Sequence, residues 1–590
     1  MTADAEIPQA RENGWREQEA PGDFRIVWMF VAAIVVKVLW GYWNRDLTFG
    51  DTAAYFVRAV TWHRFAQVDI VWSPLYTAYY GSWLWLTENA QWATLLHRVF
   101  LICVSTGLVA WVGMRTLPKL LALGLTFWWI ALPIHYDTLY EVHLFGAIPA
   151  LLMLAMAVSL RSERWRYPLV LGVAVLTTAL VRNEYSILVA ILLMAALRDV
   201  WRARKERGGR SAAGVTGRYL LCLVVAAVCV LFFYALSYSK GEYLKQEAST
   251  KHTLNMCQVY AFGYQQRHAE WTKNPWSECA GLMQETFRAA EPTLGQMIVA
   301  NPTAVARHFL WNLQLSRAGV EVLLTNATWS ENNPDYTPVL RQPLWPTLIL
   351  AITLVVLVWG GLKIRAQESA YARTTRAHVA RAMPVLVGLL LCAVAVTLTQ
   401  RPRPSYLLAQ GAVYMWLAAL CLPMLVPALT RWNSRRVLCA VGIGLLVLAP
   451  PYALLPLGSK GGLLGAYYQS LLPQANVLCS KDAKWLATTY ADELSEYLCS
   501  PYRTTAISEP KMALASQSLD AAAWTSPARF VEEAAARGFQ FVTIDAFFVD
   551  RFDKGATCED FRHAFAVAGW RIADTSPAEE HACIFLYAKS

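Results

Sequence analysis

The sequence predicts a mainly α-helical membrane protein, a polytopic bundle of about 11 transmembrane helices with a C-terminal α/β domain on the outer face. Apolar residues make up 56% of the 590-residue chain, and charged residues make up only 16%. Soluble domains carry about 25% charged residues. This composition excludes a large soluble enzyme, a disordered chain and a nucleic-acid binder. The 25 Trp and 26 Tyr are typical of proteins anchored at membrane interfaces.

Apolar runs of about 17 to 25 residues, long enough to cross a bilayer, set the predicted helices. They begin near Phe24, Thr94, Pro118, Leu144, Tyr219, Leu344, Met383, Tyr406 and Val437. Residues 168–197 form one longer run that is interrupted by Arg182, Asn183 and Glu184. Strongly basic loops flank this run on both sides, and basic loops stay cytoplasmic. We therefore expect two short helices that meet at a non-cytoplasmic turn.

The sidedness of the loops follows from this map. The stretch from Pro74 to Leu86 is too short to cross, so we expect an interfacial helix. The N-terminus then lies inside and the C-terminus outside, and the first 24 residues lack the pattern of a removable signal peptide. The expected divisions are a cytoplasmic tail (1–24), a transmembrane domain (25–455) with outer loops 44–93 and 237–343, and a C-terminal outer domain (456–590).

The C-terminal domain is predicted to be α/β because short β-rich runs alternate with amphipathic helical runs. The expected strands are 476–480, 502–508, 539–549 and 582–589, and the expected helices are 528–537 and 558–568.

Six cysteines lie outside the predicted spans, all on the outer side, which indicates disulfides in an oxidising compartment. Nearest-neighbour pairing gives Cys257 with Cys279, Cys479 with Cys499, and Cys558 with Cys583, although the sequence leaves other connectivities open. Free thiols buried as small apolar groups are the alternative. No spacing resembles a CxxC pair, so we predict no metal site.

The first outer loop contains Asp51, in the sequence GDTAAYF, at the start of an amphipathic stretch. An Asp at this position is most often a helix N-cap. The alternative is a general base at the membrane surface, which requires one carboxylate oxygen to stay free. The residues alone leave both roles open.

Other ionisable side chains recur in the short outer turns. Asp137, Glu141 and His143 lie at the start of the fourth span, and Arg182 and Glu184 lie in the turn after residue 181. Arg401 and Arg403 precede a late span. Each group could be hydrated loop residues. Their accumulation favours an anionic ligand held by guanidinium groups beside a carboxylate that moves protons.

The order and sidedness of five motifs resemble the GT-C superfamily of integral-membrane glycosyltransferases, in particular the bacterial relatives of protein O-mannosyltransferases and of the lipid A aminoarabinose transferase. The motifs are GDTAAYF, WSPLYTAYYGSWL, TLYEVHLF, LVRNEY and RPRPSYLL, and the resemblance covers roughly residues 25–430. The first loop lacks the adjacent Asp-Glu pair of the family, and the C-terminal tail has no counterpart in it.

The resemblance implies transfer of a sugar from a polyprenyl-phosphate carrier to a glycan, lipid or protein acceptor at the outer face of a bacterial inner membrane. Asp51 corresponds to the catalytic base, and the second acid of the family corresponds to Glu141 or Asp137. Arg403 and Tyr406 match the family's late-span pair, and Arg182, Arg401 or Arg403 would stabilise the departing phosphate. Trp72, Pro74 and Tyr76 would line a groove for the prenyl chain. The scheme inverts the anomeric centre and requires no metal or other cofactor.

Two other classes of function stay open. A transporter or flippase for a lipid-linked or anionic solute would also use short helices broken at RNEY. Against it, the polar groups lie on one side and the two halves show no repeat. An O-antigen ligase or polymerase would depend on an outer Arg and His and would not need a first-loop acid. Loss of activity when Asp51 is substituted would therefore distinguish the glycosyltransferase from this class.

Overall fold

The computed structural model describes most of the helical region and part of the C-terminal region. The described residues are 24–39, 51–132, 141–207, 209–237, 242–325, 344–430, 468, 471–480, 484–487, 497–502, 512–514, 519–544, 549, 555–575 and 585–589. The predicted domain boundary near residue 455 lies outside these ranges.

Within the described ranges, six helical segments are long and apolar enough to cross a membrane. They are α4 (Ala90–Thr116), α6 (Glu141–Ser159), α9 (Gly209–Ala235), α14 (Leu344–Ala366), α15 (Ala370–Gln400) and the segment Pro404–Met424, which comprises η5 (Pro404–Leu407), α16 (Leu408–Cys421) and η6 (Leu422–Met424). Much of the apolar surface of α9 and α14 is exposed, as expected of helices that face lipid. The chain is an integral membrane protein, and it is mainly α.

Four further helices lie at predicted crossings but are shorter or more polar than these six. They are α1 (Phe24–Leu39), α5 (Lys119–Ala131), α7 (Glu163–Leu180) and α8 (Ser186–Arg207). The first two have 16 and 13 residues, α7 begins with charged residues, and α8 ends with them. The crossing expected from Val437 lies outside the described residues. The number of crossings therefore stays a prediction.

The predicted break in the run 168–197 is confirmed. Helix α7 ends at Leu180, Arg182 is extended, and a single 3₁₀ turn, η4 (Asn183–Tyr185), leads into α8. The stretch from Pro74 forms α3 (Pro74–Trp83), a helix of 10 residues that is too short to cross a bilayer, and its interfacial location stays a prediction. It packs against α2 (Asp51–Phe65), where a Cβ on Gly81 would clash with the carbonyl oxygen of Ala59.

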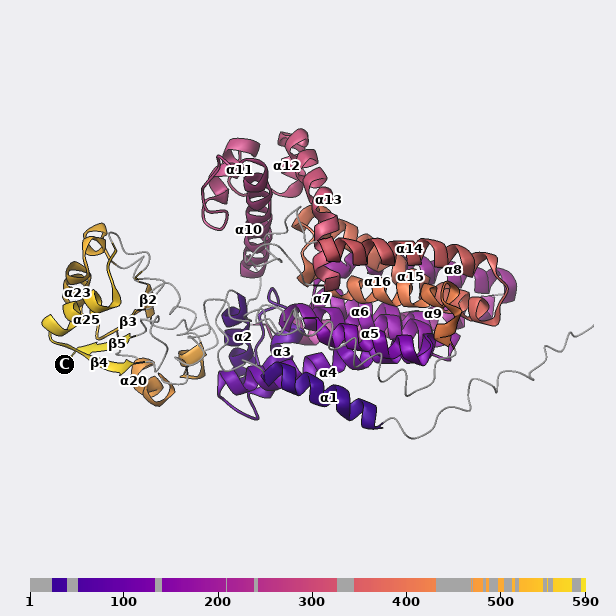
Figure 1. Cartoon of the computed structure of the whole chain (residues 1–590), viewed down its shortest axis with the longest axis horizontal. Helices are drawn as coiled ribbons and strands as arrows, with labels where there is room; N and C mark the ends of the chain where they lie inside the picture. The colour runs from indigo at the N-terminus through magenta and orange to yellow at the C-terminus, as the bar shows by residue number, and fades with distance from the viewer. Residues whose placement is uncertain are drawn as a thin grey trace, which may run out of the picture.

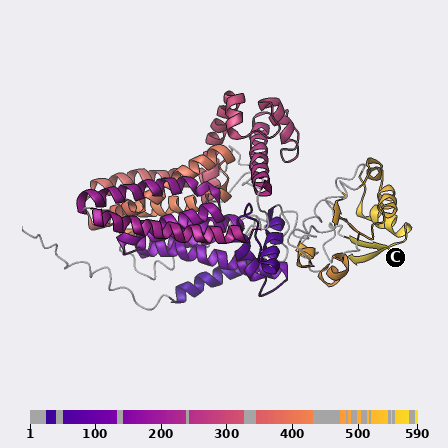
Figure 2. The same ribbon diagram turned by 180° about the vertical axis from the view of Figure 1, so that it is seen from behind.

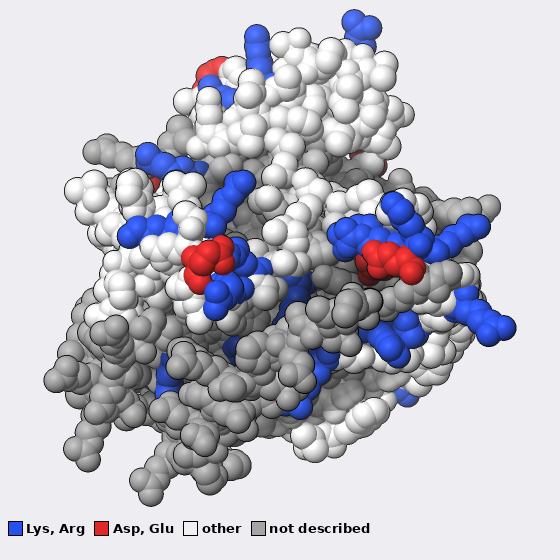
Figure 3. Space-filling view, turned by 90° about the vertical axis from the view of Figure 1, so that its right-hand side faces the viewer, with Lys and Arg blue, Asp and Glu red and all other residues white. Residues whose placement is uncertain are grey.

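The helical bundle has two different ends (Figures 1 and 2). One end, which we call the head end, carries α2, α3, the unit α10–α13 and the C-terminal strands. The opposite end carries the α8–α9 and α14–α15 connections. Figure 3 views the molecule from this opposite end, where Lys and Arg outnumber acidic side chains. The basic residues of these connections include Arg198, Arg202, Arg204, Lys205, Arg210, Lys363, Arg365, Arg373 and Arg376.

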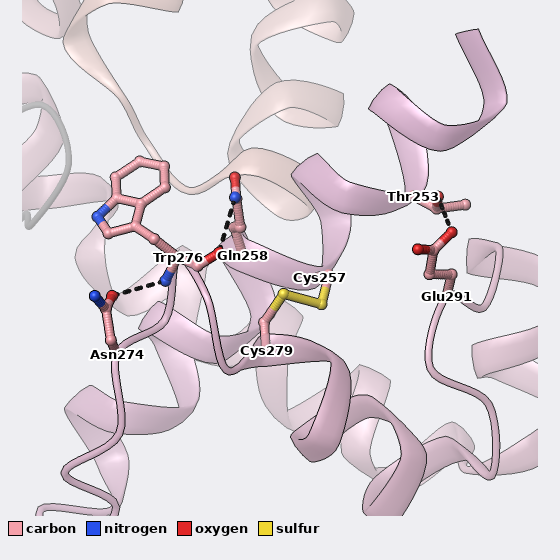
Figure 4. Close-up of a disulfide and its surroundings, with 7 residues drawn as sticks. All are labelled: Thr253, Cys257, Gln258, Asn274, Trp276, Cys279 and Glu291. Atoms are coloured by element: carbon pink, nitrogen blue, oxygen red, sulfur yellow. Dashed lines mark hydrogen bonds between the residues drawn. A yellow bond between two sulfur atoms is a disulfide. The ribbon is translucent and has the colours of Figure 1, made fainter. Parts of the chain in front are cut away.

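The segment expected to be a long outer loop is mostly helical. It contains α10 (Glu242–Arg267), α11 (Cys279–Phe287), α12 (Leu294–Ala300) and α13 (Pro302–Thr325), and these helices share a small apolar core of their own. A disulfide between Cys257 and Cys279 joins α10 to α11, and Gln258 donates a hydrogen bond to the carbonyl oxygen of Trp276 beside it (Figure 4). A capping box at Thr293 starts α12.

The C-terminal region forms a five-stranded mixed sheet with strand order β2-β1-β3-β5-β4. Strands β1 (Trp485–Ala487), β2 (Met512–Leu514) and β3 (Phe541–Ile544) are parallel, whereas β5 (Phe585–Lys589) runs antiparallel to β3 and β4 (Trp570–Thr575). Helices α23 (Pro527–Ala536) and α25 (Cys558–Val567) pack together on its apolar core. Short helical turns complete it: η8 (Leu472–Gln474), α20 (Ala475–Leu478), η9 (Ser500–Tyr502) and η10 (Ala521–Thr525).

The tail predictions were partly right. Strands β3 and β5 and helices α23 and α25 lie where they were expected. The expected strand 476–480 is wrong, because Pro473 opens a 3₁₀ turn that continues as α20. Most of the run 502–508 lies outside the described residues. Strands β1 and β2 were missed, since strands as short as three residues carry almost no periodic signal. The six-residue strand β4 was missed as well.

Two of the predicted disulfides are present, Cys257–Cys279 and Cys479–Cys499. Cys558 is also disulfide-bonded, and Cys583, its predicted partner, lies outside the described residues. Five cysteines of the predicted spans are free thiols: Cys103, Cys222, Cys229, Cys392 and Cys421.

Candidate active site at the head end of the bundle

The structure gathers predicted polar residues from three separate elements around one aromatic ring, that of Tyr406. His143 lies in the first turn of α6, Arg182 and Glu184 in the α7–α8 turn, and Arg403 just before η5. The guanidinium carbon of Arg182 is 4.3 Å from the centre of the Tyr406 ring, and that of Arg403 is 4.8 Å from it. We call these five residues the Tyr406 cluster.

Arg182 is the centre of this cluster. Its Nε lies 2.7 Å from Glu184 Oε1 in an ion pair. Its Nη1 donates a 2.8 Å hydrogen bond to His143 Nδ1, so this imidazole nitrogen carries no proton. Burial opposes the charge of Arg182, but the Glu184 carboxylate and neighbouring tyrosines raise its pKa, which keeps it a cation. Two cations therefore share one tyrosine ring, with one carboxylate beside them. Such an arrangement is suited to an anionic group.

Gly146 allows the side chain of Arg182 to lie directly against α6. A Cβ at this position would lie 2.5 Å from Arg182 Cδ, so any larger residue would displace the arginine. Tyr185 fixes the same approach, because its hydroxyl donates a 3.0 Å hydrogen bond to the carbonyl oxygen of Gly146. The sequence HLFG in α6 thus supplies His143, the hydrogen-bond partner of Arg182, and Gly146, which leaves room for the Arg182 side chain.

A second charged pair lies between α4 and α6 and is more completely buried than Arg182 and Glu184. Arg98 Nε donates to Glu141 Oε1 at 2.8 Å, and Arg98 Nη2 contacts the same oxygen. Both side chains are almost completely buried. Glu141 is therefore not a hydrated loop residue. Sequence reasoning missed Arg98, although an arginine inside a predicted span is itself a signal for an acidic partner.

Tyr76 of α3 lies close to this pair. Its hydroxyl is 3.4 Å from His97 Nε2, and burial together with the Glu141 carboxylate raises its pKa well above the usual value. The phenol therefore stays protonated. Pro74 is the first residue of α3 and is buried, whereas Trp72 is half-buried beneath the guanidinium of Arg58, at 4.1 Å.

Tyr55 connects these aromatic residues to α2. Its ring centre lies 5.3 Å from both Trp72 and Tyr76. Of the three residues predicted to line a lipid groove, Tyr76 and Pro74 are buried. Exposed aromatic side chains on α4 include Trp92 and Phe100 in its first half, which sequence reasoning did not single out.

Arg401 does not join the Tyr406 cluster. Its backbone is left-handed, with φ 64°, and its buried guanidinium lies 4.6 Å from the ring of Phe262 in α10. Pro402 packs against Gly319 of α13, where a Cβ would lie 2.6 Å from it. The two arginines of RPRP therefore serve different neighbours: Arg403 faces the cluster, and Arg401 contacts the α10–α13 unit.

Two predicted acids remain, Asp51 and Asp137. Helix α2 begins at Asp51, as the sequence predicts, but the described residues do not include its side chain. Asp137 lies outside the described residues. Among those that the structure describes, no group of three His, Cys, Asp or Glu residues could hold a metal ion.

The fold and the buried charges together define a class: a polytopic helical membrane protein with a polar site at one end of its bundle.

Comparisons with known proteins give distant structural similarities. No protein-family model and no curated protein sequence matches the chain. The chain is similar to the archaeal oligosaccharyltransferase AglB from Archaeoglobus fulgidus, solved with an inhibitory peptide and a dolichol-phosphate, with 13% identity and a TM-score of 0.38 over 96% of this chain and 75% of that one. It is also similar to the arabinofuranosyltransferase AftD from Mycobacteria, with 13% identity and a TM-score of 0.33 over 95% of this chain and 41% of that one.

Proposed function

We propose that this protein is a membrane glycosyltransferase that moves a sugar from a polyprenyl-phosphate carrier to an acceptor at the outer face of the membrane. The observation that carries the proposal is the pair of guanidinium groups, Arg182 and Arg403, over one tyrosine ring at the head end. A lipid phosphate lies at the membrane surface, and arginine binds phosphate through bidentate, charge-assisted hydrogen bonds.

The proposed reaction is a single displacement at the anomeric carbon. The acceptor hydroxyl attacks this carbon and forms the new glycosidic bond, while the bond to the phosphate oxygen breaks and the anomeric centre inverts. Asp51 accepts the hydroxyl proton. The polyprenyl phosphate leaves with increased negative charge, which Arg182 and Arg403 stabilise more than they stabilise the bound donor. Glu184 holds Arg182 in place through its ion pair, and His143 does so through its hydrogen bond.

The other predicted residues receive supporting roles. Glu141, held by Arg98, and Asp137 position the acceptor. Trp72, Pro74 and Tyr76 line a groove for the prenyl chain in this proposal, and the exposed aromatic side chains of α4, such as Trp92 and Phe100, are available to contact lipid. The head end faces outward in this proposal, because the basic connections at the opposite end are retained on the cytoplasmic side.

The test is transfer from a panel of radiolabelled polyprenyl-phosphate sugars by the purified protein and by Asp51→Asn. If Asp51 is only a helix cap, Asn should replace it, because both residues cap equally well. We expect a folded variant with carrier binding intact and transfer slowed by about 100-fold or more. The control is Asp520→Asn, an exposed acid that precedes η10, which should transfer at the normal rate.

Two outcomes would contradict the proposal. Near-normal transfer by a stable Asp51→Asn protein would remove the base from the mechanism and favour a ligase-like enzyme. Movement of labelled lipid across vesicles, without a new glycosidic bond from any donor in the panel, would indicate a flippase.

A further inference from the structure

The first part of the C-terminal region packs on the helical bundle and also supplies strand β1 of the sheet. We call residues 468–502 the docking segment, of which 468, 471–480, 484–487 and 497–502 are described. Its buried side chains Tyr468, Leu471, Tyr497 and Leu498 belong to the same apolar core as α2, α3 and α4. In β1, Trp485 belongs to this same core, whereas Leu486 belongs to the core of α23 and α25. The docking segment therefore connects the sheet to the head end.

Tyr497 makes the contact to α2. Its ring stacks on that of Phe56, with ring centres 4.6 Å apart and planes at 23°, and it is only 1% exposed. Phe56 in turn meets the ring of Tyr80 on α3 at 5.8 Å. Phe56 lies five residues after Asp51, so the same helix carries the proposed base and the ring on which Tyr497 rests.

Tyr468 makes the contact to α4. Its hydroxyl accepts a 3.0 Å hydrogen bond from the backbone N–H of Ala90, the first residue of α4. The first N–H groups of a helix have no partner within the helix, so this bond satisfies one of them. Arg98, which holds Glu141, lies two turns further along the same helix. The edge of Tyr468 also meets Tyr497, with ring centres 6.5 Å apart.

The disulfide Cys479–Cys499 ties the two halves of the docking segment together. Cys479 follows α20, and Cys499 comes two residues after Tyr497. Such a cross-link reduces the freedom of the segment when it is undocked, which favours the docked arrangement.

We propose that Tyr497 is a positioning residue for sugar transfer, and that the docking segment fixes α2 against α3 and α4 so that the C-terminal domain is a working part of the site. The inference rests on the proposed function only for the identity of the reaction that α2 serves. The contacts themselves connect the tail to the helix that begins at Asp51.

The experiment compares Tyr497→Ala with Tyr497→Phe, which keeps the stacked ring. We expect Tyr497→Ala to raise amide hydrogen exchange across residues 51–65 and to lower kcat by about tenfold to 100-fold, with little change in KM for the carrier. Tyr497→Phe should restore both. The matched control is Tyr502→Ala, since Tyr502 lies in η9 of the same segment and is 43% exposed.

The disulfides supply a second comparison. The double variant C479S/C499S should raise exchange in α2, whereas C257S/C279S, which opens the bond between α10 and α11, should not. If amide hydrogen exchange in α2 were the same in Tyr497→Ala as in the wild type, the positioning role would be overturned for any value of kcat. Raised exchange with normal kcat would overturn it as well. If the wild-type protein transferred no sugar at all, the proposed function would fail separately, because the exchange measurement does not depend on it.

Discussion

Two groups of buried charges lie at the head end, and they differ in composition. Arg98 and Glu141 form an ion pair between α4 and α6. The Tyr406 cluster contains two guanidinium groups around one tyrosine ring, with one carboxylate and an imidazole that accepts a hydrogen bond. Removing one partner of a buried ion pair strongly destabilises a fold, whereas two neighbouring guanidinium groups are suited to binding a phosphate. The first group should therefore dominate stability and the second should dominate turnover.

The largest effect is expected from Arg98→Gln. The change leaves Glu141 buried without the guanidinium that holds it, which typically costs about 3–5 kcal/mol in the free energy of unfolding. Thermal unfolding followed by tryptophan fluorescence would measure it. The double variant Arg98→Met with Glu141→Leu should recover most of the loss, because it removes both charges. A single variant as stable as the wild type would show that this pair does not hold α4 to α6.

The next effect concerns turnover. Arg403→Gln removes a cation from the proposed phosphate site, and loss of one such stabilising group commonly slows catalysis by about 10²–10³-fold. Its effect on unfolding should stay below about 2 kcal/mol, the upper range for a cation over an aromatic ring. Steady-state transfer kinetics and thermal unfolding measured on one preparation give both numbers.

Arg401→Gln provides the contrast within the same turn. Because Arg401 lies over Phe262, its loss should loosen the α10–α13 unit more than it slows transfer. Equal kinetic losses in both variants would contradict the division between the two arginines.

The smallest effect is a pH dependence outside the two charge groups, at His308 of α13. Burial, with help from Arg267 and Arg401, lowers the pKa of His308 to about 3, and the ring also accepts from Asn312 and lies against Tyr260. Below about pH 6.5 the unfolded chain binds a proton that the folded chain does not, so stability is full above this pH and falls as the pH drops. The loss should reach about 2 kcal/mol at pH 5.

The measurement is hydrogen exchange in α10–α13 at pH 7.5 and 5, corrected for the intrinsic exchange rate. His308→Gln should flatten the pH dependence, and His268→Gln, at an exposed histidine beside Glu270, should leave it unchanged. A wild-type unit equally stable at both pH values would be inconsistent with a buried neutral His308.

The sequence by itself determined the features that depend on neighbours along the chain. Apolar runs located the long helices, the charges at Arg182 to Glu184 located the break between α7 and α8, and Pro74 located the start of α3. Two cysteine pairs were predicted correctly, since each closes a short loop. These signals are local, so they survive without any knowledge of packing.

Only the tertiary structure decided which charges meet. Arg98 lies 43 residues from Glu141, and Arg182 lies 39 residues from His143. Arg401 and Arg403 are two residues apart, and a left-handed backbone at Arg401 sends them to different neighbours. The stacking of Tyr497 on Phe56 joins the tail to α2 across most of the chain. Burial makes such contacts strong, and burial is a property of the folded bundle that no run of residues contains.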